Sequence, residues 1–101
     1  MSEGQIVDFL LAPEVLAAQV KLIADALDVA GIGSDGLVLE QVAGEVIRRN
    51  VFGELGALGV EFGGGCGWSF HQTGGIVLTI NVIHDRDLLA VKSVVADWAP
   101  Q

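Results

Sequence analysis

The hydrophobic pattern of this 101-residue chain changes its period near Ala57, and no other feature constrains the fold as much. Before Ala57, apolar residues recur every three or four positions, which is typical of amphipathic helices. After Ala57 they alternate with polar residues, which is typical of strands with one buried face. A chain with both patterns in separate blocks is predicted to form an α+β domain.

Two helices are predicted in the first half. The first begins at Pro13, whose fixed φ suits the first turn of a helix, and ends before Gly31. The second begins after Ser34, a good N-cap residue, and ends between Asn50 and Gly53. Each has an apolar stripe on one side and charged residues on the other, so both are expected to lie on a common core.

Three strands and a closing helix are predicted in the second half. The strand segments are 58–62, 66–70 and 76–83, and the helix begins at Asp85 or Asp87. The fold that we expect is therefore a single domain over residues 1–101. In it, three helices pack on one face of a small three-stranded antiparallel sheet, in the order ααβββα.

The pairing of the last two strands is predicted from the faces that it creates. A loop of Gly74 and Gly75 alone would place Phe70 opposite Thr79 and separate the aromatic from the aliphatic side chains. A loop of Thr73–Gly75, with Gln72 opposite Ile76, places the large apolar side chains on one face. These are Trp68, Phe70, Leu78, Ile80 and Val82. We expect the second register, since it buries this whole set.

The same register predicts what the other face of the sheet carries. Its residues are hydroxyl, amide, imidazole and β-branched side chains, which suit a surface that a partner or a second copy of the chain covers in part. We therefore expect the partner contacts at Ser69, His71, Val77, Thr79 and Asn81. A three-stranded sheet also has two open edges, which favours a homodimer.

Composition and charge exclude several classes of protein. Hydrophobic residues make up 51% and charged residues 18% of the chain, which excludes intrinsic disorder. The formal net charge of −8 argues against direct nucleic-acid binding and leaves an acidic surface that serves solubility or engages a basic partner. The longest uncharged segment, Phe62–Ile83, is interrupted by glycines, so no membrane span is expected and the chain is predicted to be soluble and cytoplasmic.

One cysteine and two histidines are the residues that nucleophilic chemistry would need. Cys66 would require a nearby imidazole from His71 or His84 to ionise its thiol, and a small enzyme that uses such a pair is an alternative prediction. In the chosen register Cys66 shares the apolar face, whereas His71 points to the opposite face. We therefore expect a buried free cysteine and no catalytic residues.

Two further segments are weighed as binding sites. Residues 84–87, His-Asp-Arg-Asp, could bind a divalent metal, but helix capping accounts for the same carboxylates. The glycine-rich segment 63–67 lies between two strands and lacks a following Lys-Ser/Thr, so a bulge or loop is favoured over a phosphate site. Neither a metal nor a cofactor is expected.

The last part of the chain resembles a known family. Residues 75–89, Gly-Ile-Val-Leu-Thr-Ile-Asn-Val-Ile-His-Asp-Arg-Asp-Leu-Leu, run from a strand into a helix with an acidic start. Together with the segment from Ala57, they are similar to the last three strands and the closing helix of roadblock/LC7 domains. Residues 35–39 are also similar to a short hairpin strand of that family. The resemblance covers at most the final 45 residues well. It implies a homodimeric scaffold that binds or regulates small GTPases, or tethers larger assemblies, without active-site chemistry of its own.

The function that the sequence favours is a small, acidic, non-enzymatic protein-interaction or assembly module. A protein partner and a second copy of the chain are its expected binding partners.

Overall fold

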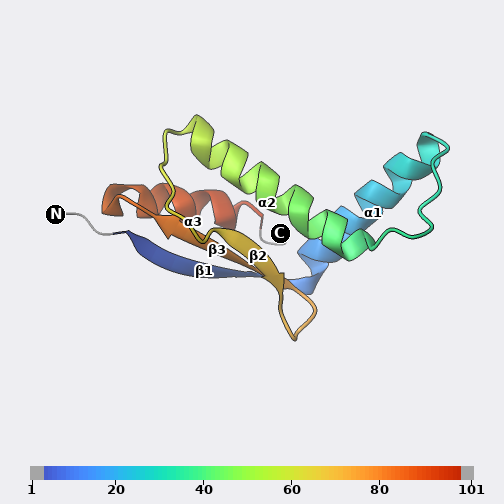
Figure 1. Cartoon of the computed structure of the whole chain (residues 1–101), viewed down its shortest axis with the longest axis horizontal. Helices are drawn as coiled ribbons and strands as arrows, with labels where there is room; N and C mark the ends of the chain where they lie inside the picture. The colour runs from blue at the N-terminus through green and yellow to red at the C-terminus, as the bar shows by residue number, and fades with distance from the viewer. Residues whose placement is uncertain (1–3, 99–101) are drawn as a thin grey trace.

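The computed structural model describes residues 4–98, which form three α-helices, one short 3-10 helix and three strands (Figure 1). The elements are β1 (Gln5–Leu11), α1 (Pro13–Val29), α2 (Leu39–Ala57), β2 (Gly67–Phe70), β3 (Ile76–Val82), η1 (Asp85–Asp87) and α3 (Leu88–Ala96). The predicted α+β class is confirmed. The predicted order ααβββα is wrong, because a strand comes first and only two strands follow α2.

The three strands form one antiparallel sheet with β3 in the centre, between β1 and β2. Burial along β3 alternates strictly, and its inner residues are at most 1% exposed. These inner residues are Ile76, Leu78, Ile80 and Val82. They form one cluster with Leu16 of α1, Ile47 of α2 and Val91 of α3. One face of the sheet is therefore packed against the helices, and the core is a single layer between them.

The strand at the N-terminus was not expected. The hydrophobic pattern predicts the first strand at 58–62, whereas the structure has it at Gln5–Leu11, paired with β3 along its whole length. Of the predicted segment, Phe62 reaches the sheet through an isolated bridge to Val82, and the Glu61 carbonyl accepts from the N–H of Ile83 (3.5 Å). The strand count is thus right, but one of the three strands is a different segment.

The structure shows why 58–60 is not a strand. Helix α2 continues to Ala57, since the buried Leu55 extends its apolar face. It ends in a Schellman motif, in which Gly59 has φ +83° and donates from its N–H to the Gly56 carbonyl (3.0 Å). The N–H of Val60 donates to the carbonyl of Leu55 (3.1 Å). These bonds fix a tight turn where the alternating pattern predicts extended chain.

The starts of the two long helices differ in how well the sequence predicts them. Helix α1 begins at Pro13 and ends at Val29, as predicted. Helix α2 begins after Val38, so the predicted N-cap at Ser34 is wrong. Ser34 instead closes a turn, in which its carbonyl accepts from the N–H of Leu37 (3.0 Å).

The hairpin between β2 and β3 keeps the predicted faces in a different register. Phe70 lies opposite Ile76, where Gln72 was expected. The shift arises because the loop closes one residue earlier, with the N–H of His71 donating to the carbonyl of Gly75 (2.8 Å). A shift of two residues leaves every side chain on its face, so the apolar residues of both strands still share one side of the sheet.

Helix α1 leaves the end of the sheet, and the loop that joins it to α2 lies far from the strands (Figure 1). We call residues 22–41, from the second half of α1 to the start of α2, the helical arm. It helps to make the molecule elongated, with extents of 52 × 28 × 27 Å. Leu16 is the one buried residue of α1. Within residues 4–98, no helix is both long and apolar enough to cross a bilayer.

Candidate functional site

The face of the sheet that the helices do not cover is the predicted place of partner contacts. We call it the outer sheet face. It consists of Ile6, Asp8, Leu10, Ser69, Val77, Thr79 and Asn81. The register pairs Leu10 with Val77, Asp8 with Thr79, Ile6 with Asn81, and Ser69 with Val77. Residues from all three strands therefore form one continuous surface.

Four of the five predicted partner-binding residues lie on the outer sheet face, and the fifth lies beside it. His71 follows the end of β2 and belongs to the hairpin loop. The N–H of Thr73 donates to His71 Nδ1 (3.2 Å), and the Thr73 hydroxyl lies 2.8 Å from the same nitrogen. The His71 ring is thus held by its own loop.

Strand β1 adds three residues that sequence reasoning missed. Ile6 is 67% exposed and Leu10 is 56% exposed, although both are large apolar side chains. The signal in the sequence is weak, since residues 6–11 are apolar except for Asp8 and show no alternation that would assign them to two faces. With β1 included, the outer sheet face is more apolar than the predicted residues alone suggest.

The centre of the outer sheet face is polar. The Thr79 hydroxyl donates to Asp8 Oδ1 (2.9 Å) across the β1–β3 pair, and both residues keep contact with solvent. The Asp8 carboxylate therefore has one protein partner and relies on water for its other hydrogen bonds. Apolar residues of β1 lie on either side of it along the strand.

The outer edge of the sheet next to β2 is interrupted by a bulge. Phe62 lies opposite Val82, and Gly67 lies opposite Thr79. Residues 63–66 thus face a stretch of β3 that holds only two residues, and the extra residues bend the chain outward. Such a bulge blunts this edge of the sheet against pairing with another strand.

Asn81 and Cys66 hold the bulge in place. The Asn81 carbonyl accepts from the N–H of Gly63 (2.8 Å), and the Asn81 side-chain amide donates to the Gly64 carbonyl (3.0 Å). The Asn81 N–H donates to Cys66 Sγ (3.2 Å), and the thiol lies 3.3 Å from the Gly63 carbonyl, to which it donates. Cys66 is half-buried, and its sulfur takes part in two hydrogen bonds with the backbone. The prediction of a buried cysteine that acts as a small apolar residue is therefore wrong.

The two histidines take other partners than this thiol. His71 Nδ1 is bonded within its loop, and His84 Nε2 lies 3.4 Å from Glu61 Oε2. Within residues 4–98, neither imidazole forms a hydrogen bond with Cys66. The structure therefore does not bring together the residues of the alternative enzyme prediction.

The segment 84–87 forms the approach to α3. Asp85 and Asp87 lie in η1, and Asp87 is the N-cap of α3 without a side-chain hydrogen bond to the helix. Across the described part of the chain, no group of three or more His, Cys, Asp or Glu side chains is placed to hold a metal ion.

A polar contact between α2 and β2 involves Glu45 and Trp68. Glu45 accepts hydrogen bonds from the Arg48 guanidinium (Nε to Oε1, 3.1 Å) and from Trp68 Nε1 (3.1 Å). These bonds, the one to Arg48 first, lower the pKa of Glu45 to about 2. The Trp68 ring lies directly on Gly44, where a Cβ atom would approach it to 2.6 Å. This contact ties α2 to β2.

No family model, curated protein or solved structure matches this chain.

Proposed function

We propose that this protein is a small, acidic, non-enzymatic interaction or assembly module that forms a homodimer through the outer sheet face. The observation that carries the proposal is the exposure of Ile6 (67%) and Leu10 (56%) on a sheet whose central strand β3 is packed against the core on its other face. Large apolar side chains that are exposed together on a rigid sheet favour an interface.

A homodimer would bury these apolar residues on both subunits. In a two-fold interface the same patch is used on both subunits, so Ile6 and Leu10 each contribute two times. Burying one such side chain fully is worth about 1.5–3 kcal/mol. Val77, which lies opposite Leu10, extends the apolar part of the patch across β3.

The edges of the sheet also favour an interface at β1. Strand β1 is an edge strand of seven residues without proline. The edge next to β2 is blunted by the bulge at 63–66, so the open edge and the apolar residues of the outer sheet face meet at β1. A second copy that covers the outer sheet face can also contact this edge.

Asp8 limits how tightly such a dimer can bind. Any subunit that covers the outer sheet face removes water from the Asp8 carboxylate, for which Thr79 supplies only one hydrogen bond. Burying a charge without full compensation is costly. We therefore expect a reversible dimer, and Asp8→Asn should strengthen it by removing the charge while keeping an acceptor for Thr79.

The test is the mass of the protein in solution as a function of concentration, measured by sedimentation equilibrium. We expect dimers of the wild-type chain and monomers of Leu10→Asp, which places a carboxylate on the outer sheet face. Leu89→Asp is the matched control, because Leu89 is an equally large and 79% exposed residue on α3. A monomeric wild-type chain, or a Leu10→Asp variant that dimerises like the control, would contradict the proposal.

A scaffold for a small GTPase is the second candidate function. The strand β3 leads through η1 into α3, which is one part of the roadblock/LC7 resemblance, whereas the segment 58–62 is not the further strand that the resemblance implies. That resemblance implies a homodimer, so a monomeric chain in the same experiment would count against this candidate as well.

A further inference from the structure

Helix α1 has an apolar stripe that is exposed from Ala18 to Val29, while Val15 at its start is partly buried against the core. The stripe runs along the whole helix on one side, with spacings of three, four and seven residues. Its members are Val15, Ala18, Leu22, Ala26 and Val29. Leu22 is 63% exposed and Val29 is 90% exposed. The opposite side of α1, with Leu16, already faces the core. The exposed stripe is thus a second apolar face on the same helix.

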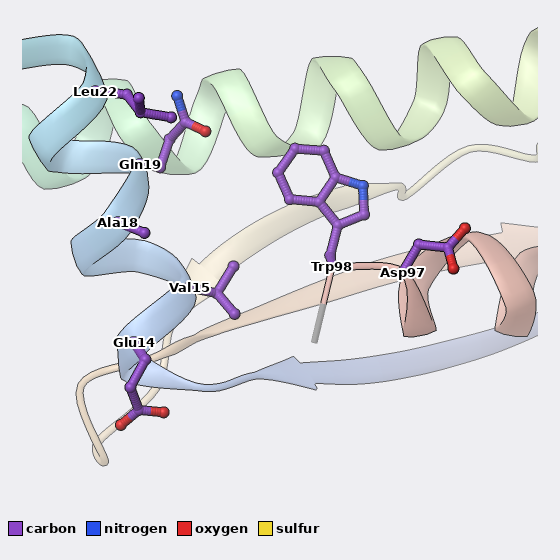
Figure 2. A pocket seen from close by; sticks show the side chains of 7 residues that line it. All are labelled: Glu14, Val15, Ala18, Gln19, Leu22, Asp97 and Trp98. Carbon is purple, nitrogen blue, oxygen red and sulfur yellow. The ribbon is translucent and has the colours of Figure 1, made fainter. Parts of the chain in front are cut away.

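The first half of the stripe forms one wall of a groove. Figure 2 shows Val15 and Leu22 on the side of α1 toward which Trp98, just after α3, stands. The groove between them has a volume of about 310 Å³, and its lining includes the carboxylates of Glu14 and Asp97. Apolar surface with acidic groups at its margin is the shape and chemistry of a helix-binding groove.

The charges around the stripe select the kind of partner. Glu14 and Asp97 line the groove, and Asp25 and Asp28 lie on the same helix as the stripe, while residues 22–44 contain no lysine or arginine. Lys21 is the one cation of α1. A second copy would bring a chain of net charge −8 to this acidic surface, whereas a cationic partner would be attracted to it.

We propose that the exposed stripe of α1 binds an amphipathic, cationic helix of another protein. The apolar side chains of that helix would lie between Leu22 and Trp98 and along the stripe to Val29, and its lysines or arginines would face Glu14, Asp25 and Asp97. Val15 and Val29 are fourteen residues apart, so the stripe accommodates about four turns of a partner helix, roughly 21 Å. This surface is separate from the outer sheet face, and the proposal does not depend on the homodimer.

The proposal is tested with a labelled synthetic peptide of about four helical turns, with leucine at heptad positions a and d and lysine elsewhere. Binding to the full chain is followed by fluorescence anisotropy, and the intrinsic emission of Trp98 is followed in a Trp68→Phe background. We expect saturable binding that weakens with salt and a blue shift of the Trp98 emission.

Two variants locate the binding site. Leu22→Gln should weaken binding by about tenfold or more, since it removes a central apolar contact of the stripe. Leu89→Gln, the same change at an exposed residue of α3, should leave binding unchanged. A glutamate version of the peptide should not bind.

Three results would overturn the proposal. The first is no binding of the lysine peptide. The second is equal binding to Leu22→Gln and Leu89→Gln, which would show a non-specific attraction to an acidic protein. The third is a lower mass in solution for Leu22→Gln than for the wild-type chain, measured without peptide. That result would show that the stripe binds a second copy of this chain and is not free for a partner helix. The mass of Leu10→Asp tests the outer sheet face separately, so the two proposals can fail independently.

Discussion

Strand β3 and helix α1 are both amphipathic in sequence, yet their apolar side chains differ in how far they are buried. Every second residue of β3 is buried against the helices, with Leu78 and Ile80 at 0% exposure. Helix α1 has seventeen residues, of which Leu16 is buried, and large apolar side chains such as Leu22 face outward. The comparison teaches that an amphipathic pattern shows that a face is suited to burial, but not which molecule covers it.

The overall dimensions reflect the same difference. The Cα radius of gyration is 14.8 Å, whereas a compact domain of this length has a value of about 13 Å. The sheet and the helices above it form the body of the molecule, and the helical arm projects from one end (Figure 1). Most of the buried apolar side chains lie in the body, whereas the arm carries exposed apolar side chains that other molecules can contact.

The largest effect on the free energy of unfolding is expected from the first of two matched leucine-to-alanine substitutions. Leu78→Ala removes a fully buried side chain from the centre of β3 and should cost about 2–5 kcal/mol of the free energy of unfolding. Leu22→Ala makes the same change in the helical arm, where it should alter stability by less than about 0.5 kcal/mol. Urea denaturation at equal protein concentrations measures both.

A similar loss in the two variants would mean that the helical arm packs as tightly as the body. The comparison between the two regions would then be wrong, and so would the availability of Leu22 for a partner.

Two glycines of α2 allow a finer comparison within one helix. A Cβ at Gly44 would lie 2.6 Å from the Trp68 ring, whereas a Cβ at Gly53 would meet no atom within 4 Å. Gly53→Ala should therefore stabilise the protein by up to about 1 kcal/mol through helix propensity. Gly44→Ala should destabilise it by about 1–2 kcal/mol, because overpacking against Trp68 outweighs the same gain.

Thermal unfolding followed by circular dichroism gives the sign of each change, and the Trp68 signal in the near ultraviolet reports on the displaced ring. If both substitutions stabilise the protein, the contact of Trp68 with Gly44 is looser than the structure shows.

The parts of the fold that the sequence predicts are those set by local chemistry or by side-chain periodicity. Pro13 defines the start of α1, and the alternation along β3 assigns its two faces. The shift in the β2–β3 register could not be predicted, because it depends on the hydrogen bond between His71 and Gly75 inside the loop. Gly75 also lies against the Leu11 carbonyl, where a Cβ would come within 2.0 Å, so β1 restricts this turn.

The candidate site was predicted in part for the same reasons. Val77 and Thr79 were assigned to the outer sheet face from periodicity alone, and the structure places them there. Ile6 and Leu10 were missed, because a short, mostly apolar segment next to a strong helix start does not reveal which strand it will join. The pairing of β1 with β3 joins segments about seventy residues apart, and such non-local contacts leave no local signal in the sequence.

The smallest expected effect concerns Glu45, which joins α2 to β2 where body and arm meet. Its pKa falls from 4.5 to about 2, first because Arg48 donates to the carboxylate and second because the Trp68 indole does. The ionised form is thus favoured in the folded state. Its stabilising contribution is fully present above pH 4.5 and is lost as the pH falls toward 2. Glu45 is about half exposed, so solvent screens the contact and the effect is modest.

The change to make is Glu45→Gln, with melting temperatures measured from pH 6 down to pH 2. We expect the wild-type chain to melt above the variant at pH 6, and this difference to shrink through the interval between 4.5 and 2 as the carboxylate takes up its proton. In Trp68→Phe, which keeps a ring over Gly44 but removes the indole N–H, the same substitution should produce a smaller pH-dependent difference. A difference between wild type and Glu45→Gln that stays constant over this range would show that Glu45 contributes through packing of its side chain and not through its charge.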